Sequence, residues 1–269
     1  MIAASVFLLL PDKGRTRSLP HMVSFAIGAL LGAAFLGLLP HALESPYITD
    51  AHDITFTVLV GLLTFFVLEK LVIWRHCHHL ECEVHGSDEF LADAHDNDHT
   101  HDHTHEHAHK HESDHAHNHG HAPAGTLVLV GDAVHNFVDG ILIAAAFLTD
   151  VHLGIVTALA VAAHEIPQEV GDFAILLQSG FSRSKALFFN ILSSLTTVLG
   201  ALLAYYSLSS AENYLPYVLA VAASSFIYVA VADLIPGLHK QTAVSESIKQ
   251  IALIAVGVTV VFTSHSFLH

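Results

Sequence analysis

Charged residues are scarce in this sequence, and basic residues are the scarcest of them. Charged side chains make up 13% of the 269 residues, against roughly 25% in an ordinary soluble domain. Ten Lys and Arg stand against 25 Asp and Glu, which gives a formal net charge of −15. A nucleic-acid partner is therefore not expected, because phosphate contacts depend on Lys and Arg. With 52% hydrophobic residues, the composition predicts a membrane protein.

Seven apolar runs approach the ~20 residues that a helix needs to cross a bilayer. They cover residues 20–41, 54–74, 125–148, 153–178, 184–208, 214–236 and 250–268. The apolar stretch IAASVFLLL, residues 2–10, is shorter and counts as a first, incomplete span. We therefore expect an all-α, polytopic membrane bundle of eight transmembrane helices in a 3+5 arrangement. Helices 1–3 lie in residues 1–75 and helices 4–8 in residues 124–269.

The basic residues determine the expected orientation of these spans. With eight spans, all ten Lys and Arg fall on one side of the membrane, and the positive-inside rule makes that side cytoplasmic. The opposite loops, at 42–53 and 209–213, hold acidic residues and no Lys or Arg. Both termini are thus predicted outside. We favour a bacterial inner membrane over an internal eukaryotic one.

One connection is far longer than the others and divides three spans from five. Residues 76–123 carry 16 of the 25 histidines, many in His-x-His alternation with Asp and Glu between them. Such a segment has little apolar surface to bury, so we expect disorder without metal. Evenly spaced imidazoles favour several weak, exchangeable metal sites over one fixed geometry. A merely solvated linker is the alternative. The predicted loop ligands are His99, His101, His103, His105, His107, His109 and His111.

Two cysteines are present, Cys77 and Cys82, both on the predicted cytoplasmic side. Thiols stay reduced there, so a structural disulfide is not expected. Together with His76, His78 and His79 they could form one tighter metal site. The CHHLEC spacing is not that of a standard structural zinc site.

Two neighbouring spans carry polar residues at a depth where such groups are costly and usually mark ion or substrate paths. In GDAVHNFVDG, His135 and Asp139 are four residues apart, and in HEIPQEVGDF, His164 and Gln168 repeat that spacing. Residues four apart share one face of a helix. Two facing helices would therefore bring these four side chains together. For any one of them, an interhelical hydrogen bond is the alternative role.

A mixed nitrogen and oxygen ligand set suits zinc, iron(II) or manganese. Asn136 and Glu165 follow the two histidines directly, so six groups could hold two ions that share Asp139. Pro167 removes a backbone hydrogen bond and frees the carbonyl oxygen of Ala163 at the same depth. Helix contacts or a proton path would explain some further polar residues equally well. These additional candidates are Glu169, Asp172, Asn190 and His41.

The two motifs resemble those of the ZIP (Zrt/Irt-like) metal transporters. HNFVDG at 135–140 is similar to that family's fourth-span motif, and HEIPQEVGDF at 164–173 to its fifth-span motif of the HExPxExGDF type. The resemblance covers nearly the whole chain, including the eight spans and the His-rich loop. It implies a binuclear metal centre between spans four and five and zinc as the main substrate. It also implies uptake toward the cytosol, a homodimer, and movement of one helix group against another.

By position, the resemblance implies a main site of His135, Asp139, His164 and Gln168. A second site would take Asn136 and Glu165 together with the shared Asp139 and Gln168. Family members usually have His or Glu where this chain has Gln168, which implies weaker binding or altered selectivity. They often have a polar residue, commonly His, near the position of Gly37, and here His41 is close by.

Three other functions share parts of this pattern. HEIPQ begins like the HExxH motif of metalloproteases, but Gln168 stands where the second zinc histidine is required, so an enzyme is not expected. A divalent metal exporter would share the His-rich loop, and a membrane metal sensor would share the ligands. We expect transport of divalent cations into the cytoplasm, chiefly Zn²⁺, with Fe²⁺, Mn²⁺ and Cd²⁺ as further candidate substrates.

Overall fold

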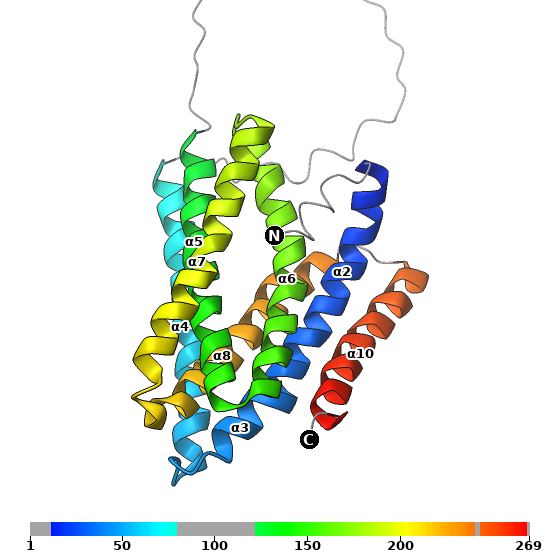
Figure 1. The fold of residues 1–269 in the computed structure, drawn as a ribbon. Helices are drawn as coiled ribbons and strands as arrows, with labels where there is room; N and C mark the ends of the chain where they lie inside the picture. Colours follow the sequence, from blue (N-terminus) through cyan, green and yellow to red (C-terminus); the bar gives the residue numbers. More distant parts are fainter. Residues whose placement is uncertain (1–11, 80–121, 240–242, 268–269) are drawn as a thin grey trace, which may run out of the picture.

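The computed structural model describes residues 12–79, 122–239 and 243–267, and within them every regular element is a helix (Figure 1). The predicted short first span, the loop histidines and Cys82 lie outside these residues. The elements are α2 (Asp12–Gly32), η1 (Ala33–Leu38), α3 (Leu39–Leu43), α4 (Ala51–His79), α5 (Ala122–Thr149), α6 (Val151–Gln178), α7 (Arg183–Leu208), η2 (Glu212–Tyr214), α8 (Leu215–Tyr228), η3 (Val229–Leu234), α9 (Ile235–Leu238) and α10 (Val244–Phe267).

Six stretches of the described chain are long and apolar enough to cross a membrane. They are Ser18–Leu43, Ala51–Leu71, Gly125–Thr149, Arg183–Leu208, Glu212–Leu238 and Val244–Ser264. The remaining long helix, α6, has 28 residues, but its His, Glu, Gln and Asp side chains lower its hydropathy. The seven long helical stretches match the predicted spans to within a few residues, except that α2 begins at Asp12 rather than at residue 20 and α10 begins at Val244 rather than at residue 250. The all-helical membrane architecture is therefore confirmed.

Two of the spans contain a wider, π-helical turn. The turn η1 joins α2 to α3, and η3 joins α8 to α9. Pro40 and Pro236 follow these turns closely and donate no backbone hydrogen bond, which leaves carbonyl oxygens one turn earlier without their usual partner. In contrast, α6 continues as one helix through Pro167. The proline thus changes the hydrogen bonding of α6 without ending it.

Glycines allow two helix pairs to approach until their backbones touch. A Cβ added at Gly140 of α5 would overlap the backbone oxygen of Thr197 in α7, and one at Gly200 would overlap that of Phe137. The same holds for Gly28 of α2 against the backbone oxygen of Ile254 in α10. Gly28 and Gly32 form a GxxxG pattern in α2, and its first glycine allows this close packing against α10. Among the described helices, the pairs α5–α7 and α2–α10 share the most extensive contacts.

The side of the bundle that faces outward is apolar. Large hydrophobic side chains on α4, α7 and α10 are exposed, among them Phe56, Phe188 and Ile251. The interior contains fully buried hydrophobic side chains such as Ile27 and Leu30 of α2. An outer surface covered by large hydrophobic side chains suits contact with lipid rather than with water.

Asp150 starts α6, and we expect its replacement by alanine to destabilise the protein by about 1 kcal/mol. The Asp150 carboxylate accepts hydrogen bonds from the backbone N–H groups of Leu153 at 2.9 Å and His152 at 2.8 Å. These bonds, the one from Leu153 foremost, hold the pKa of Asp150 below its usual range. The stabilisation is therefore complete above the unfolded pKa and is lost as pH falls through the lower folded pKa.

Thermal unfolding of wild type and Asp150→Ala in detergent tests this cap. The Tm difference is expected at pH 7 and should become smaller at about pH 3, below the usual pKa of an Asp carboxyl group. An equal difference at both pH values would contradict an ionised cap.

Candidate metal centre

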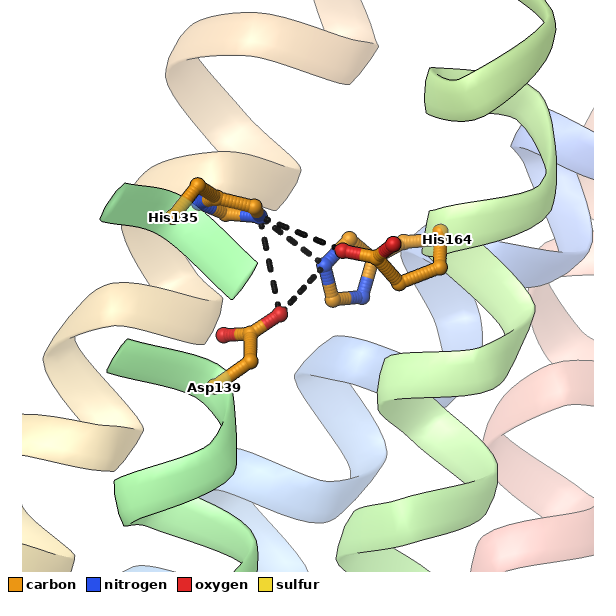
Figure 2. A group of neighbouring side chains, drawn as sticks. His135, Asp139 and His164 are labelled. Atoms are coloured by element: carbon orange, nitrogen blue, oxygen red, sulfur yellow. Dashed lines mark hydrogen bonds and ion pairs between the residues drawn. The ribbon is translucent and has the colours of Figure 1, made fainter. Parts of the chain in front are cut away.

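Four ligand atoms from α5 and α6 converge near the middle of the bundle. His135 and Asp139 come from α5, and His164 and Glu165 come from α6. The Nε2 atoms of the two histidines are 3.3 Å apart, and each lies close to Asp139 Oδ2, at 3.5 Å for His135 and 3.3 Å for His164 (Figure 2). Glu165 Oε1 is 3.9 Å from His135 Nε2. All four ligand atoms lie within 4.8 Å of one another.

Two of the four atoms are buried oxygens without a hydrogen-bond partner in the described part of the chain. They are Asp139 Oδ2 and Glu165 Oε1. Native interiors rarely leave such atoms unsatisfied, and each case asks for an explanation, such as an ion. Asp139 and His164 are each 1% exposed, whereas the side chain of His135 is 25% exposed. The cluster is therefore deeply buried and open on the His135 side.

The backbone of α6 orients the ring of His164. Its Nδ1 lies 3.2 Å from the carbonyl oxygen of Ala160, one turn earlier. A carbonyl only accepts, so Nδ1 carries the proton and the lone pair is on Nε2, which points into the cluster. Phe226 of α8 packs edge-on against this ring, with centroids 6.3 Å apart. The ring thus directs Nε2 toward the cluster, where the neutral form can bind an ion.

Asn136 and Gln168 are near this cluster but have other partners. Asn136 donates from Nδ2 to Asp132 Oδ1 at 2.9 Å, and its Oδ1 accepts from the Thr197 hydroxyl at 2.9 Å. The side chain of Gln168 hydrogen-bonds to the carboxyl group of Asp132. Both predicted ligands are therefore engaged at Asp132, a residue that the sequence analysis did not single out as a ligand. Asp132 lies four residues before Asn136 and therefore on the same helix face, which is the feature of the sequence that could have indicated this contact.

The additional candidates fall into two separate places. Glu169 and Asn190 are buried on α6 and α7, one or two turns away from His164 and toward the end where α5 begins. Asp172 follows Glu169 by one further turn. His41 instead lines a cavity of about 390 Å³ at the opposite end, together with Glu44, Tyr47 and Glu212.

Two imidazole nitrogens and two carboxylate oxygens form a ligand set that suits zinc in tetrahedral coordination. The set contains no thiolate or thioether, so it does not suit copper(I). It also lacks a nucleophile held by a base, and its two carboxylates are shared with imidazoles. The geometry therefore favours holding a divalent cation.

Comparisons with known proteins agree with this geometry. Residues 2–264 match the family model described as ZIP Zinc transporter. Zinc transporter ZIP13 of Danio rerio is 32% identical over 270 residues, which cover 93% of this chain and 77% of that protein. Zinc transporter ZIP13 of Mus musculus is 31% identical, with coverages of 94% and 71%.

A nematode protein is similar over a smaller share of its length. Zinc transporter zipt-7.1 of Caenorhabditis briggsae is 36% identical over 243 residues, which cover 81% of this chain and 61% of that protein. All three relatives are animal proteins and give no support to the expected bacterial membrane. The family model spans nearly the whole chain, so the chain belongs to the ZIP zinc transporter family, whose members are membrane transporters and not enzymes.

Proposed function

We propose that this protein carries divalent metal ions, chiefly zinc, across a membrane into the cytoplasm through the cluster of His135, Asp139, His164 and Glu165. The observation that carries the proposal is the convergence of these four ligand atoms within 4.8 Å. Two of them are buried oxygens with no other partner among the described residues. Ionisable groups at this depth of a helical bundle are costly and usually mark an ion path.

The exposure of the ligands suggests the order in which an ion meets them. His135 is the most accessible, because its side chain is 25% exposed while that of Asp139 is 2% exposed. An incoming ion exchanges water for His135 first and then for Asp139 and His164. Movement of α5 and α6 relative to α2, α4 and α8 then opens the cluster toward the cytoplasm.

A second ion requires a rearrangement. Asn136 and Gln168 complete the second site only after they leave Thr197 and Asp132. The Asp132 carboxylate then loses two hydrogen bonds, so double occupancy changes the contacts of α5 with α6 and α7. We propose that this coupling accompanies transport. Fe²⁺, Mn²⁺ and Cd²⁺ are further candidate ions for the same oxygen and nitrogen ligands.

The proposed orientation has both termini outside and the His-rich loop in the cytoplasm. Helices α2, α5, α7 and α10 begin at one end of the bundle, and α4 and α6 end there (Figure 1). Arg183 and Lys185 lie in the first turn of α7, Lys249 lies in the second turn of α10, and Lys70 lies one residue before the end of the apolar stretch Ala51–Leu71, which fits the positive-inside rule. The loop histidines accept the released ion. A homodimer and eight spans remain part of this proposal through the family resemblance.

Zinc content of cells distinguishes uptake from the alternatives. Cells that express the protein in zinc-supplemented medium should accumulate more total zinc than cells that express Asp139→Ala at equal protein level. An exporter would lower cellular zinc relative to that control, and a sensor would leave it unchanged. Either of these two results would contradict the proposed function.

A further inference from the structure

A second group of buried oxygens lies next to the histidine cluster, between α5, α6 and α7. The Ser193 hydroxyl of α7 donates to the Asp132 carboxylate of α5. The neighbouring Ser194 hydroxyl donates to Glu169 Oε1 of α6 at 2.7 Å. All four residues are at most 6% exposed. The hydroxyls therefore join three helices through two carboxylates.

One turn beyond these bonds, two buried oxygens have no partner within the described residues. They are Asp172 Oδ2 on α6 and Asn190 Oδ1 on α7. Asn190 is 5% exposed. It precedes Ser193 and Ser194 by three and four residues and so shares the face of α7 that meets the carboxylates.

The two unpaired oxygens lie on the same side of the network. Asp172 follows Glu169 along α6, and Asn190 precedes Ser194 along the antiparallel α7, so both are displaced toward the end where α5 begins. Asp132 also lies one turn from His135 in this direction. Asp132 is bound by Ser193, and the adjacent Ser194 binds Glu169, which lies one turn before Asp172 on α6.

Two adjacent carboxyl groups and a buried amide oxygen are an unfavourable set when both carboxyl groups are ionised and no cation is bound. Like charges at short range repel, and a buried amide oxygen without a donor loses its hydration. A divalent ion satisfies all three groups at once, because carboxylate and amide oxygens are its ordinary protein ligands. Helix packing alone leaves the two free oxygens unexplained.

We propose that Asp132, Asp172 and Asn190 form a separate, all-oxygen cation site that receives zinc as it leaves the histidine cluster. The role in transit rests on the proposed function, whereas the binding does not. Oxygen ligands alone hold zinc less firmly than imidazole, which suits a station from which the ion is released. Asn136 connects the two sites, because it follows His135 and hydrogen-bonds to Asp132.

Cadmium binding tests whether Asp172 and Asn190 share one ion. The full-length double variant Asp172→Cys/Asn190→Cys is titrated with Cd²⁺, and the ultraviolet absorbance of cadmium–thiolate bonds is measured. The wild-type protein is titrated in the same way, and its absorbance gives the contribution of Cys77 and Cys82. We expect extra absorbance that saturates at one additional Cd²⁺ per chain and exceeds the sum of the two single variants. Absorbance equal to that sum, or no gain, would overturn the site.

Zinc uptake by proteoliposomes tests the role in transit. Asp172→Asn keeps the side-chain volume and is expected to lower the initial rate about tenfold. Glu69→Gln is the matched control, because Glu69 of α4 accepts from Tyr228 and is outside the site, and it should transport at the wild-type rate. Unchanged uptake in Asp172→Asn would remove the site from the path. Absence of uptake by the wild-type protein would instead contradict the proposed function. The cadmium titration would still show whether the residues of the proposed site share one ion.

Discussion

Replacement of His164 by alanine should reduce the initial rate of zinc uptake by at least about 100-fold. The effect should be larger than that of changing a residue that only hydrogen-bonds to a metal ligand, because His164 itself supplies a ligand atom. His164 supplies a fixed Nε2 atom at 3.3 Å from both His135 Nε2 and Asp139 Oδ2. It is 1% exposed, so it holds its nitrogen at a position that bulk solvent does not reach in the wild-type protein. Asp139 would then face the ion with one imidazole instead of two.

His152 provides the matched control for this prediction. It lies in the first turn of the same helix, and its side chain is 35% exposed. His152→Ala should therefore transport zinc at nearly the wild-type rate. His164→Gln removes the imidazole but keeps most of the buried side-chain volume, so it separates loss of the ligand from a folding defect caused by a cavity. Radioactive zinc uptake into proteoliposomes measures all three variants, and wild-type uptake by both His164 variants would contradict the assignment.

Gly140→Ala is the second change with a large expected effect. The added Cβ would overlap the backbone oxygen of Thr197, and a backbone atom cannot rotate away as a side chain does. The pair α5–α7 must separate, at a cost of about 3 kcal/mol. For a chain of this size, that lowers Tm by roughly 6–12 °C. Because Gly140 follows Asp139, the same displacement should also lower zinc uptake.

Gly131→Ala is the same substitution on the same helix and serves as the control. A Cβ at Gly131 meets no atom within 4 Å. Alanine has the higher helix propensity by up to about 1 kcal/mol, so Tm should stay constant or rise. Thermal unfolding of the two variants in one detergent makes the comparison. Equal Tm values for Gly140→Ala and Gly131→Ala would contradict the backbone contact between α5 and α7.

The sequence was sufficient to locate the long helices of the described residues and four of the polar side chains that converge between α5 and α6. Apolar runs end where polar or turn residues begin, so span limits follow from composition. His135 and Asp139 share a helix face by spacing alone, and His164 with Glu165 occupies the corresponding depth of the next span. The structure brings these four groups together.

The partners of Asn136 and Gln168 could not be predicted in this way. Spacing gives the face of a helix, but it does not give the rotation of that helix against its neighbours. Gln168 shares the His164 face, yet its side chain reaches Asp132. Asn136 is held between α5 and α7 by Thr197, a contact between residues 61 positions apart that no local pattern indicates.

The close α5–α7 contact was also beyond sequence reasoning. Gly140 and Gly200 indicate that some helix can approach closely, but small residues do not identify which one. The reciprocal overlap of each glycine with a backbone oxygen of the other helix became visible only in three dimensions.

Time-resolved zinc uptake into proteoliposomes that contain an internal zinc dye is the most direct test of the central claim. Three proteins are compared: wild type, His135→Ala, and a variant that lacks residues 86–121 of the His-rich segment. The account predicts rapid uptake by wild type, loss of uptake in His135→Ala, and continued uptake without the loop. The account would be contradicted if His135→Ala took up zinc at the wild-type rate, or if only the loop deletion lost zinc uptake. Either result would place transport outside the intramembrane cluster.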